Sequence, residues 1–165
     1  VFVVNSFSKY FGMTGWRVGW LVAPEAAVPE LEKLAQNFYI APSTIGQHAA
    51  VAALGDEAMG VHEARRRAFC ERRNVLVAGL RDLGLAVPRI PEGAFYVYAQ
   101  LPEGCEDSFT FCRRLLETHG VAATPGTDFG THGAERHVRF ACTAGVDRIR
   151  VALARLGTAL AERAA

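Results

Sequence analysis

The chain has 165 residues, half of them apolar and 21% charged, and its formal net charge is +1 at pH 7. A charge so near zero excludes the broad basic surface with which proteins bind nucleic acid. No apolar run approaches the roughly 20 residues that span a bilayer, and the opening residues lack the length and basic flank of a secretory signal. We therefore expect a globular protein without a nucleic-acid or membrane partner. The sequence opens inside an apolar run with no initiator methionine, which indicates a piece of a longer polypeptide.

The cysteines and lysines limit which reactive groups the chain can offer. The four cysteines form no C-x-x-C pair and have no zinc-finger spacing to histidines. We predict reduced thiols that serve as small apolar side chains in a cytoplasmic protein, and no metal site. The only lysines are Lys9 and Lys33. Because Lys33 lies among Glu30 and Glu32 in a segment of helical character, we expect it to form a solvated ion pair. Lys9 is then the one plausible chemical amine.

The first 60 residues are expected to form two strands, a loop between them and two helices. Residues 1–5 form an apolar run typical of a buried strand, and residues 16–23 alternate as a second strand that ends at Pro24. Proline followed by an acidic residue predicts a helix from Pro24 to about Gln36. Residues 37–43 are expected to be extended, and the alanine-rich residues 44–54 to be helical.

After Gly60 the pattern changes to one long helix and then to short strands that alternate with helices. Apolar residues recur at helical spacing over residues 61–83 and stop at Gly84. The arginines at 65–67 are interpreted as a solvated face paired with Glu63 and Glu71. A domain boundary near Gly60 would divide residues 1–60 from residues 61–165. Further on we expect strands at 86–90, 95–101, 121–124 and 137–142, and helices at 108–119, capped by Asp107 or Ser108, and at 146–163.

The densest chemical signal is the run from Ser6 to Trp20. It places Lys9 after a strand, flanked by Ser6 and Ser8, with Arg17 eight residues further on. Burial favours the neutral form of a lysine amine, which can then react with an aldehyde. Hydroxyls and a guanidinium suit a phosphate dianion, because both donate hydrogen bonds to its oxygens. Ordinary turn hydroxyls are the alternative for the two serines.

This run closely resembles the pyridoxal-phosphate attachment site of class I/II aminotransferases of fold type I. The glycines of that pattern are also present, as Gly12, Gly15 and Gly19. The resemblance implies that Lys9 holds pyridoxal 5'-phosphate as a Schiff base and moves the proton at the substrate α-carbon. It also implies contacts to the cofactor phosphate from Ser6 and Arg17, with Ser8 as a further hydroxyl.

Resemblance to the same family continues near the end of the chain. In the strand HVRFAC at 137–142, Arg139 falls on the family position that binds the substrate α-carboxylate, a role that suits a bidentate guanidinium. The alternative is an arginine on the solvent face of an edge strand. The loop PGTDFG at 125–130 resembles one that carries an aromatic residue, here Phe129, at the substrate mouth. In the segment GAFY at 93–96, which resembles the start of the central strand, we interpret Phe95 and Tyr96 as core residues.

The resemblance covers essentially the whole chain, as the carboxyl-terminal portion of such an enzyme. It implies an α+β small domain, a short mixed or antiparallel sheet with helices packed on it, over residues 61–165. Residues 1–60 would be a remnant of the large α/β cofactor domain. A homodimer is also implied, in which residues 37–44, including Tyr39, reach toward the partner's site. The expected reaction is transamination between an α-amino acid and an α-keto acid.

We expect the 165 residues to supply only part of the cofactor site. Family residues that hold the cofactor ring and part of its phosphate precede the lysine, so we predict that the 165 residues alone are not a competent transaminase. Two alternatives stay open: β-elimination or decarboxylation with the same cofactor, and a non-catalytic cofactor-sensing domain of a transcription regulator. The substrate side chain is not determined, because Arg139 reads only the carboxylate that all candidates share.

Overall fold

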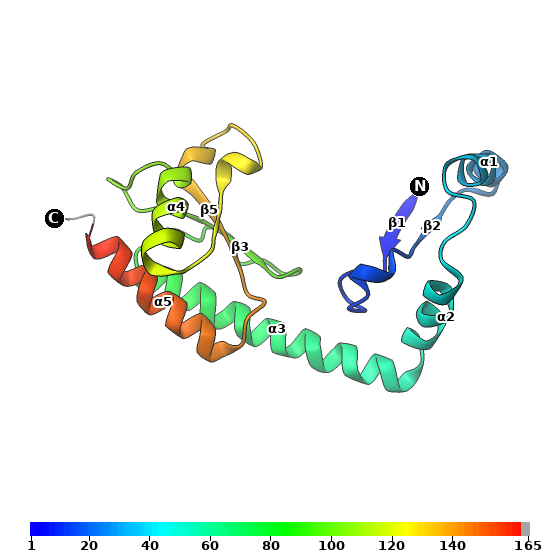
Figure 1. The fold of residues 1–165 in the computed structure, drawn as a ribbon, viewed down its shortest axis with the longest axis horizontal. Coiled ribbons are helices and arrows are strands. Elements are labelled where there is room, and N and C mark those ends of the chain that lie inside the picture. Colours follow the sequence, from blue (N-terminus) through cyan, green and yellow to red (C-terminus); the bar gives the residue numbers. More distant parts are fainter. Residues whose placement is uncertain (163–165) are drawn as a thin grey trace. The chain divides into compact units, whose positions relative to one another are not determined.

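The computed structural model describes residues 1–162 and divides into two compact units, Val1–Arg66 and Arg67–Ala165 (Figure 1). The first unit contains two strands, two helices and the beginning of a long helix, α3, which continues into the second unit. The second unit adds a three-stranded sheet and two further helices. In chain order the elements are β1 (Val3–Ser6), β2 (Gly19–Val22), α1 (Val28–Phe38), α2 (Thr44–Ala53), α3 (Asp56–Asp82), β3 (Tyr96–Gln100), α4 (Ser108–His119), β4 (Thr124–Pro125), β5 (His137–Ala141) and α5 (Val146–Ala161).

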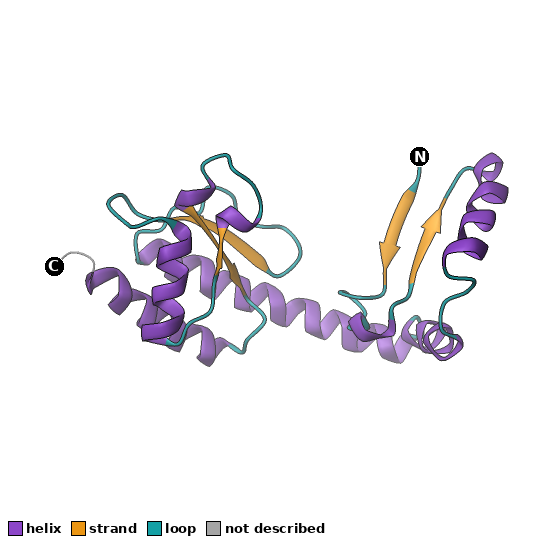
Figure 2. Ribbon diagram, turned by 45° about the horizontal axis from the view of Figure 1, so that its top comes forward, coloured by secondary structure: helices purple, strands orange, loops and turns teal. Residues whose placement is uncertain are grey.

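The first unit is built on the antiparallel pair β1 and β2, drawn as two arrows in Figure 2. The loop between the strands folds back to form a small core against α2. This core consists of Phe7, Met13, Val18, Ala50 and Ala53. The helix approaches closely because its residues are small: a Cβ on Gly46 would lie 2.8 Å from Val18 Cγ2. The helix predicted at 44–54 from its alanine content is confirmed as α2.

The strand predicted at residues 1–5 is shifted, and the prediction that it is buried is wrong for this chain. All four residues of β1 are exposed, Val4 to 80%. Among the described residues only β2 pairs with β1, and the residues of both strands are exposed to solvent. Trp16, near the start of the second predicted strand, and Trp20, within β2, are 45% and 38% exposed. An apolar pattern predicts a strand that can be buried, and burial itself requires a layer packed against it.

Helix α3 begins earlier than its apolar stripe predicts. It starts at Asp56, and Gly60 lies inside it, at a cost of about 1 kcal/mol relative to alanine. Acidic residues in the first turn favour this start, because they complement the partial positive charge of a helix N-terminus. The helix ends before Gly84, whose φ of 82° is a left-handed conformation that glycine adopts without strain. The two units divide within this helix, between Arg66 and Arg67.

The second unit packs an antiparallel sheet of strand order β3-β5-β4 against helices. Helix α4 has the predicted bounds, and the Asp107 side chain caps it by accepting hydrogen bonds from the Phe109 and Thr110 amides. Helices α3 and α5 pack so closely that a Cβ on Gly79 would collide with Leu153. The largest fully buried side chains of the core are Leu80, Val97, Phe111, Leu115, Val138 and Leu156.

Three predictions for the second unit are corrected by the structure. The strand expected at 86–90 is a single bridge from Ala86 to Gln100, because Pro88 and Pro91 have no N–H to donate. The strand expected at 121–124 is the short β4, Thr124–Pro125. The edge-strand alternative for Arg139 fails because β5 is the central strand. Residue 163, the end of the last predicted helix, lies outside the described residues.

The described residues contain no helix long and apolar enough to cross a membrane. Over residues 1–162 no three metal-ligating side chains gather as a metal site would require. All four cysteines are free. Burial raises the pKa of the Cys112 thiol to about 12, so this sulfur packs as an apolar group and is not a nucleophile.

Candidate functional site

The lysine loop, residues 6–15, is a compact turn closed by its own backbone. The Phe7 amide donates to the Val18 carbonyl at 3.1 Å, and the Met13 amide donates to the Phe7 carbonyl at 3.1 Å. At the tip, the Gly12 amide donates to the Lys9 carbonyl at 3.0 Å. Lys9 therefore opens a tight turn and is exposed, while Phe7 and Met13 anchor the loop in the core.

The loop brings the hydroxyls of Ser6 and Ser8 side by side. Ser6 Oγ donates to Ser8 Oγ at 2.8 Å, and the Ser8 amide donates to Ser6 Oγ at 3.0 Å. Thr14 Oγ1 donates to the Ser8 carbonyl at 2.6 Å, which fixes the far side of the loop. Both serines thus act as turn hydroxyls, and their oxygens form a local pair next to Lys9. A pair of hydroxyls in this position can also donate to an anion.

Arg17 leaves the loop in an unusual backbone conformation. Its φ is 53° and its ψ is 46°, in the left-handed region that costs a non-glycine residue about 1–2 kcal/mol. Its Nη1 donates to the Thr14 carbonyl at 2.9 Å. A guanidinium has five N–H donors and this bond uses one of them. Strain of this kind is retained where a side chain must point in one direction, so the conformation favours a binding role.

Arg139 lies in the second unit, in the middle of the central strand. It faces Tyr98 on β3 and Thr124 on β4 in the sheet register. Its Nη2 donates to Thr124 Oγ1 at 3.3 Å. Its guanidinium carbon lies 4.1 Å from the ring centroid of Tyr96 and 4.4 Å from that of Phe129. The cation is therefore half-buried between strands and stacked on two aromatic rings, which restricts its orientation.

Phe129 reaches Arg139 because its loop is tightly built. The Phe129 amide donates to the Gly126 carbonyl at 2.9 Å and closes a short turn. A Cβ on Gly126 would lie 2.6 Å from the Tyr98 hydroxyl and 2.7 Å from the His137 carbonyl oxygen, so only glycine fits. Phe129 itself is 51% exposed. The motif PGTDFG therefore encodes a turn that presents an exposed aromatic ring to Arg139.

Sequence reasoning missed Tyr96 and Thr124. The prediction that Tyr96 is a core residue is wrong: its ring is 36% exposed and stacks on Arg139, while Phe95 does pack against the core. The signal was present in the alternation of β3, where Val97 and Ala99 are buried and the residues between them are exposed. Because side chains alternate across a strand, Tyr96 had to lie on the face opposite Val97.

Lys9 and its neighbours belong to one unit, and Arg139 with Phe129 belongs to the other. The first unit thus offers an amine with anion donors, and the second offers a cation on an aromatic platform. A lysine amine can react with a carbonyl carbon, but the burial expected to favour that reaction is not found, because Lys9 is exposed in this chain. An oriented guanidinium suits a carboxylate.

The comparisons assign the chain to a family. Residues 1–156 match the family model for aminotransferases of class I and II, and the chain belongs to this family. It is 40% identical over 156 residues to the valine–pyruvate aminotransferase of Mycobacterium tuberculosis, covering 94% of this chain and 40% of that protein. It is also 40% identical over 152 residues to the LL-diaminopimelate aminotransferase of Natranaerobius thermophilus, covering 92% and 38% of the two chains.

Solved structures agree with this assignment. A crystal structure of an aminotransferase from Mycobacterium tuberculosis superposes with a TM-score of 0.91 at 40% identity, covering 98% of this chain and 42% of that one. The aromatic aminotransferase of Pyrococcus horikoshii OT3 gives a TM-score of 0.90 at 30% identity, covering 99% and 43%. The fold is therefore part of the fold-type-I architecture, and the chain spans about 40% of the length of the curated relatives that it matches.

Enzymes of this family depend on pyridoxal phosphate. The lysine loop fits that group chemically, because it carries an amine at Lys9 and the hydroxyl pair of Ser6 and Ser8, and the guanidinium of Arg17 follows it in the chain. A phosphorylated aldehyde needs donors for its phosphate and an amine for its carbonyl carbon, and the loop offers both.

Proposed function

We propose that this chain forms the lysine-bearing and carboxylate-binding part of an aminotransferase that moves an amino group from an α-amino acid to an α-keto acid. The observation that carries the proposal is Arg139, a cation oriented by two aromatic rings and a threonine in the middle of a small sheet. Partial burial of a cation costs desolvation free energy. A planar anion that forms charge-assisted hydrogen bonds to the guanidinium would offset this cost. The family match and the lysine loop supply the other half of the argument.

Lys9 is the proposed catalytic residue. When bound, pyridoxal phosphate supplies an aldehyde that accepts an amine and a ring that withdraws electrons from the substrate α-carbon. Lys9 Nζ holds the cofactor in the resting enzyme. With cofactor and substrate bound, the same nitrogen would take the proton from the substrate α-carbon and later return it. The tight turn from Lys9 to Gly12 restricts where that nitrogen can reach.

Ser6, Ser8 and Arg17 are proposed to hold the cofactor phosphate. Ser8 Oγ can donate one hydrogen bond to the phosphate, and Ser6 Oγ can donate a second when it exchanges its bond to Ser8 Oγ for one to the phosphate. The guanidinium adds a charge that stays positive at every working pH. All three sit on the loop or at its end, beside Lys9. The phosphate would therefore fix the cofactor at one end while the lysine fixes it at the other.

Arg139 and Phe129 are proposed to bind the substrate. Arg139 takes the α-carboxylate, and the exposed ring of Phe129 closes over the apolar part of the substrate. The relatives are named for valine, diaminopimelate, and aspartate or prephenate, whose side chains differ in charge and size. All the amino acids among them share an α-amino group and an α-carboxylate. The proposal therefore assigns to this chain the recognition of those shared groups.

We also propose that the enzyme is a cytoplasmic homodimer. Four free thiols are the ordinary state of cysteine in a reducing compartment. The end of α1 and the two residues after it expose three large apolar side chains, Phe38, Tyr39 and Ile40, and Ile40 is 83% exposed. Its φ of 66° is rare for a β-branched residue. Sedimentation of the full-length protein at micromolar concentration should give twice the monomer mass, and a monomer would contradict the proposal.

The test of the reaction uses the full-length protein with pyridoxal phosphate. L-valine, L-aspartate and LL-diaminopimelate are each offered with pyruvate or 2-oxoglutarate, and the new amino acid and keto acid are quantified together. Lys9→Ala should abolish turnover, whereas Lys33→Ala should leave it unchanged, because Lys33 only pairs with the exposed Glu30. Arg139→Lys should raise KM for the amino acid roughly 10- to 100-fold, since it loses a charge-assisted hydrogen bond.

The outcomes separate the proposal from its alternatives. Equal amounts of new amino acid and new keto acid support transamination. Keto acid and ammonia released without any acceptor would indicate a lyase, and loss of the carboxylate carbon would indicate a decarboxylase. Cofactor binding without turnover on any pair would favour a sensor domain. The 165 residues alone are expected to give no transamination.

A further inference from the structure

The tip of the lysine loop rests on the first turns of α3. Tyr10 and Phe11 are the two central residues of the turn that Lys9 opens and Gly12 closes. Both rings contact His62, with centroid distances of 5.5 Å from Tyr10 and 5.3 Å from Phe11. His62 is buried, and its Nε2 lies 3.1 Å from the Ala53 carbonyl oxygen at the end of α2. The turn therefore sits on a fixed aromatic platform.

A hydrogen bond joins the same turn to the next residue of the helix. Tyr10 Oη donates to Glu63 Oε1 at 2.7 Å, across 53 positions of sequence. The other oxygen of Glu63 accepts a hydrogen bond from Arg66 Nε at 2.9 Å. The arginine thus orients the carboxylate, and the carboxylate orients the tyrosine. The hydrogen bond to Glu63 raises the pKa of Tyr10, because ionisation would remove the donated proton and place a phenolate beside a carboxylate.

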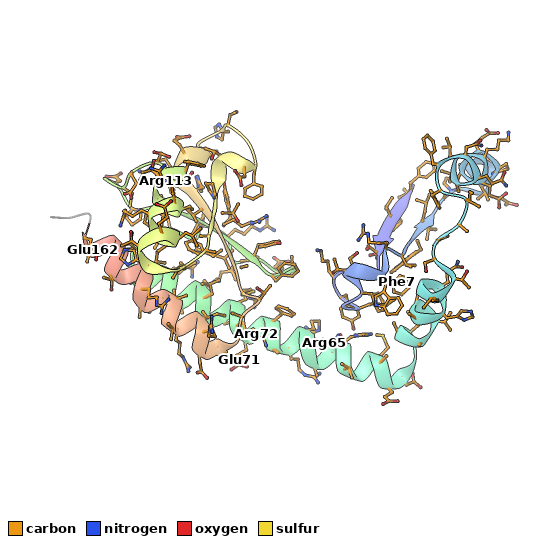
Figure 3. The ribbon with its side chains drawn as sticks, in the orientation of Figure 1. Phe7, Arg65, Glu71, Arg72, Arg113 and Glu162 are labelled. Carbon is orange, nitrogen blue, oxygen red and sulfur yellow. The ribbon has the colours of Figure 1, made fainter. Side chains whose placement is uncertain are left out.

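The last residue of the turn also meets α3. Gly12 has a φ of 67°, and a Cβ at this position would lie 2.8 Å from Arg65 Nη1. Figure 3 labels Arg65 on the helix and Phe7, which anchors the other end of the loop. Tyr10 and Phe11 therefore contact α3, and at Gly12 the helix leaves no room for a larger side chain. A loop anchored by one residue can pivot, whereas two successive contacts restrict the turn to one orientation.

We propose that Tyr10 and Glu63 are positioning residues for Lys9, which hold the lysine turn in one orientation on helix α3. The inference rests on the proposed function only in taking Lys9 as the reactive amine. Tyr10 and Glu63 hydrogen-bond to each other, and Glu63 also accepts a hydrogen bond from Arg66, so we assign their effect to the turn that contains Tyr10.

The test is made on the full-length protein with Tyr10→Phe, Glu63→Ala and the double variant. Tyr10→Phe keeps the ring contacts with His62 and removes only the hydroxyl, so the fold is preserved. Glu71→Ala is the matched control, because it removes the same side chain from an exposed position on the same helix. The first readout is hydrogen exchange of the Gly12 and Met13 amides without added cofactor. The second is the rate at which pyridoxal phosphate and borohydride label Lys9, followed by mass spectrometry.

Loss of one hydrogen bond at a partly exposed site should speed exchange of both amides roughly two- to fivefold. Labelling of Lys9 should slow by a similar factor. The double variant should match Glu63→Ala, because Glu63→Ala already removes the bond to Tyr10. Glu63→Ala also removes the ion pair with Arg66, so Tyr10→Phe is the variant that isolates the tyrosine bond. The Glu71→Ala control should behave as wild type. Unchanged exchange and labelling in both Tyr10→Phe and Glu63→Ala would overturn the inference.

The outcomes keep this inference apart from the proposed function. If the wild type transaminates but the variants leave the loop and its labelling unchanged, the reaction stands and the positioning role fails. If the variants loosen the loop but the wild type never transaminates, the positioning role stands and the proposed reaction fails. No rescue variant is required, because Tyr10→Phe retains the aromatic ring.

Discussion

Replacing Tyr96 by leucine tests whether an aromatic ring orients the proposed carboxylate-binding cation. The ring lies 4.1 Å from the guanidinium carbon of Arg139. A cation–π contact is worth about 0.5–1 kcal/mol when exposed and about 2 kcal/mol when desolvated. Tyr96 is 36% exposed and Arg139 is half-buried, so we take about 1 kcal/mol for the contact. At about 1.4 kcal/mol per factor of ten, the expected effect is about fivefold.

The fivefold effect should fall on KM for the amino acid and leave kcat nearly unchanged. In the proposed function Arg139 binds the carboxylate equally before and during the reaction, and losing such uniform binding raises KM alone. Steady-state transamination by the full-length Tyr96→Leu variant measures both parameters, and thermal unfolding checks the fold. Tyr96→Phe is the control, because it keeps the ring and should behave as wild type. A Tyr96→Phe variant as weak as Tyr96→Leu, or a Tyr96→Leu variant with unchanged KM, would refute the reasoning.

Two further predictions concern stability. Gly12→Ala should lower the free energy of unfolding by roughly 1–2 kcal/mol, because φ is 67° and Arg65 occupies the space of the new methyl group. Gly15→Ala, with open space around it, should change little, and equal urea midpoints for the two variants would contradict this account. Asp107→Ala should cost about 1 kcal/mol at pH 7 by uncapping α4. Hydrogen bonds, chiefly from the Thr110 amide, lower the pKa of Asp107, so its contribution is present above the ordinary carboxyl range and lost as pH falls through the lowered value. Thermal unfolding of the wild type and Asp107→Ala should therefore converge in acid, and a constant difference would count against the cap.

Local signals in the sequence predicted the local structure well. Helix α4 has the predicted bounds because its cap, Asp107, and its last turn before Gly120 are set by nearest neighbours in the chain. Lys33 forms the exposed ion pair with Glu30 expected from helical spacing. The start of α3 was placed too late, because its first turn carries acidic residues and Gly60 in place of the apolar stripe. A helix predicted from periodic apolar residues is placed to start at the first of those residues.

The predictions that failed were those of burial, which depends on what packs against a strand. The apolar residues 1–5 were expected to be buried, yet β1 is exposed in this chain because burial depends on what packs against it. Tyr96 was taken as core from its composition, although its strand has one buried and one exposed face. Alternation separates the two faces of a strand, and only packing decides which of them meets the core.

The sequence by itself determined which reactive side chains lie at short spacing: an amine flanked by hydroxyls, an arginine that we propose for a phosphate, and a second arginine within a strand that we propose for a carboxylate. These are properties of side chains at short spacing, which the order of residues defines directly. The tertiary structure decided what surrounds them. It placed Tyr96 and Phe129 on Arg139, and it placed Tyr10 against Glu63 across 53 positions of sequence. Such contacts arise when strands pair and helices pack, so residues far apart in the chain become neighbours only in the folded protein.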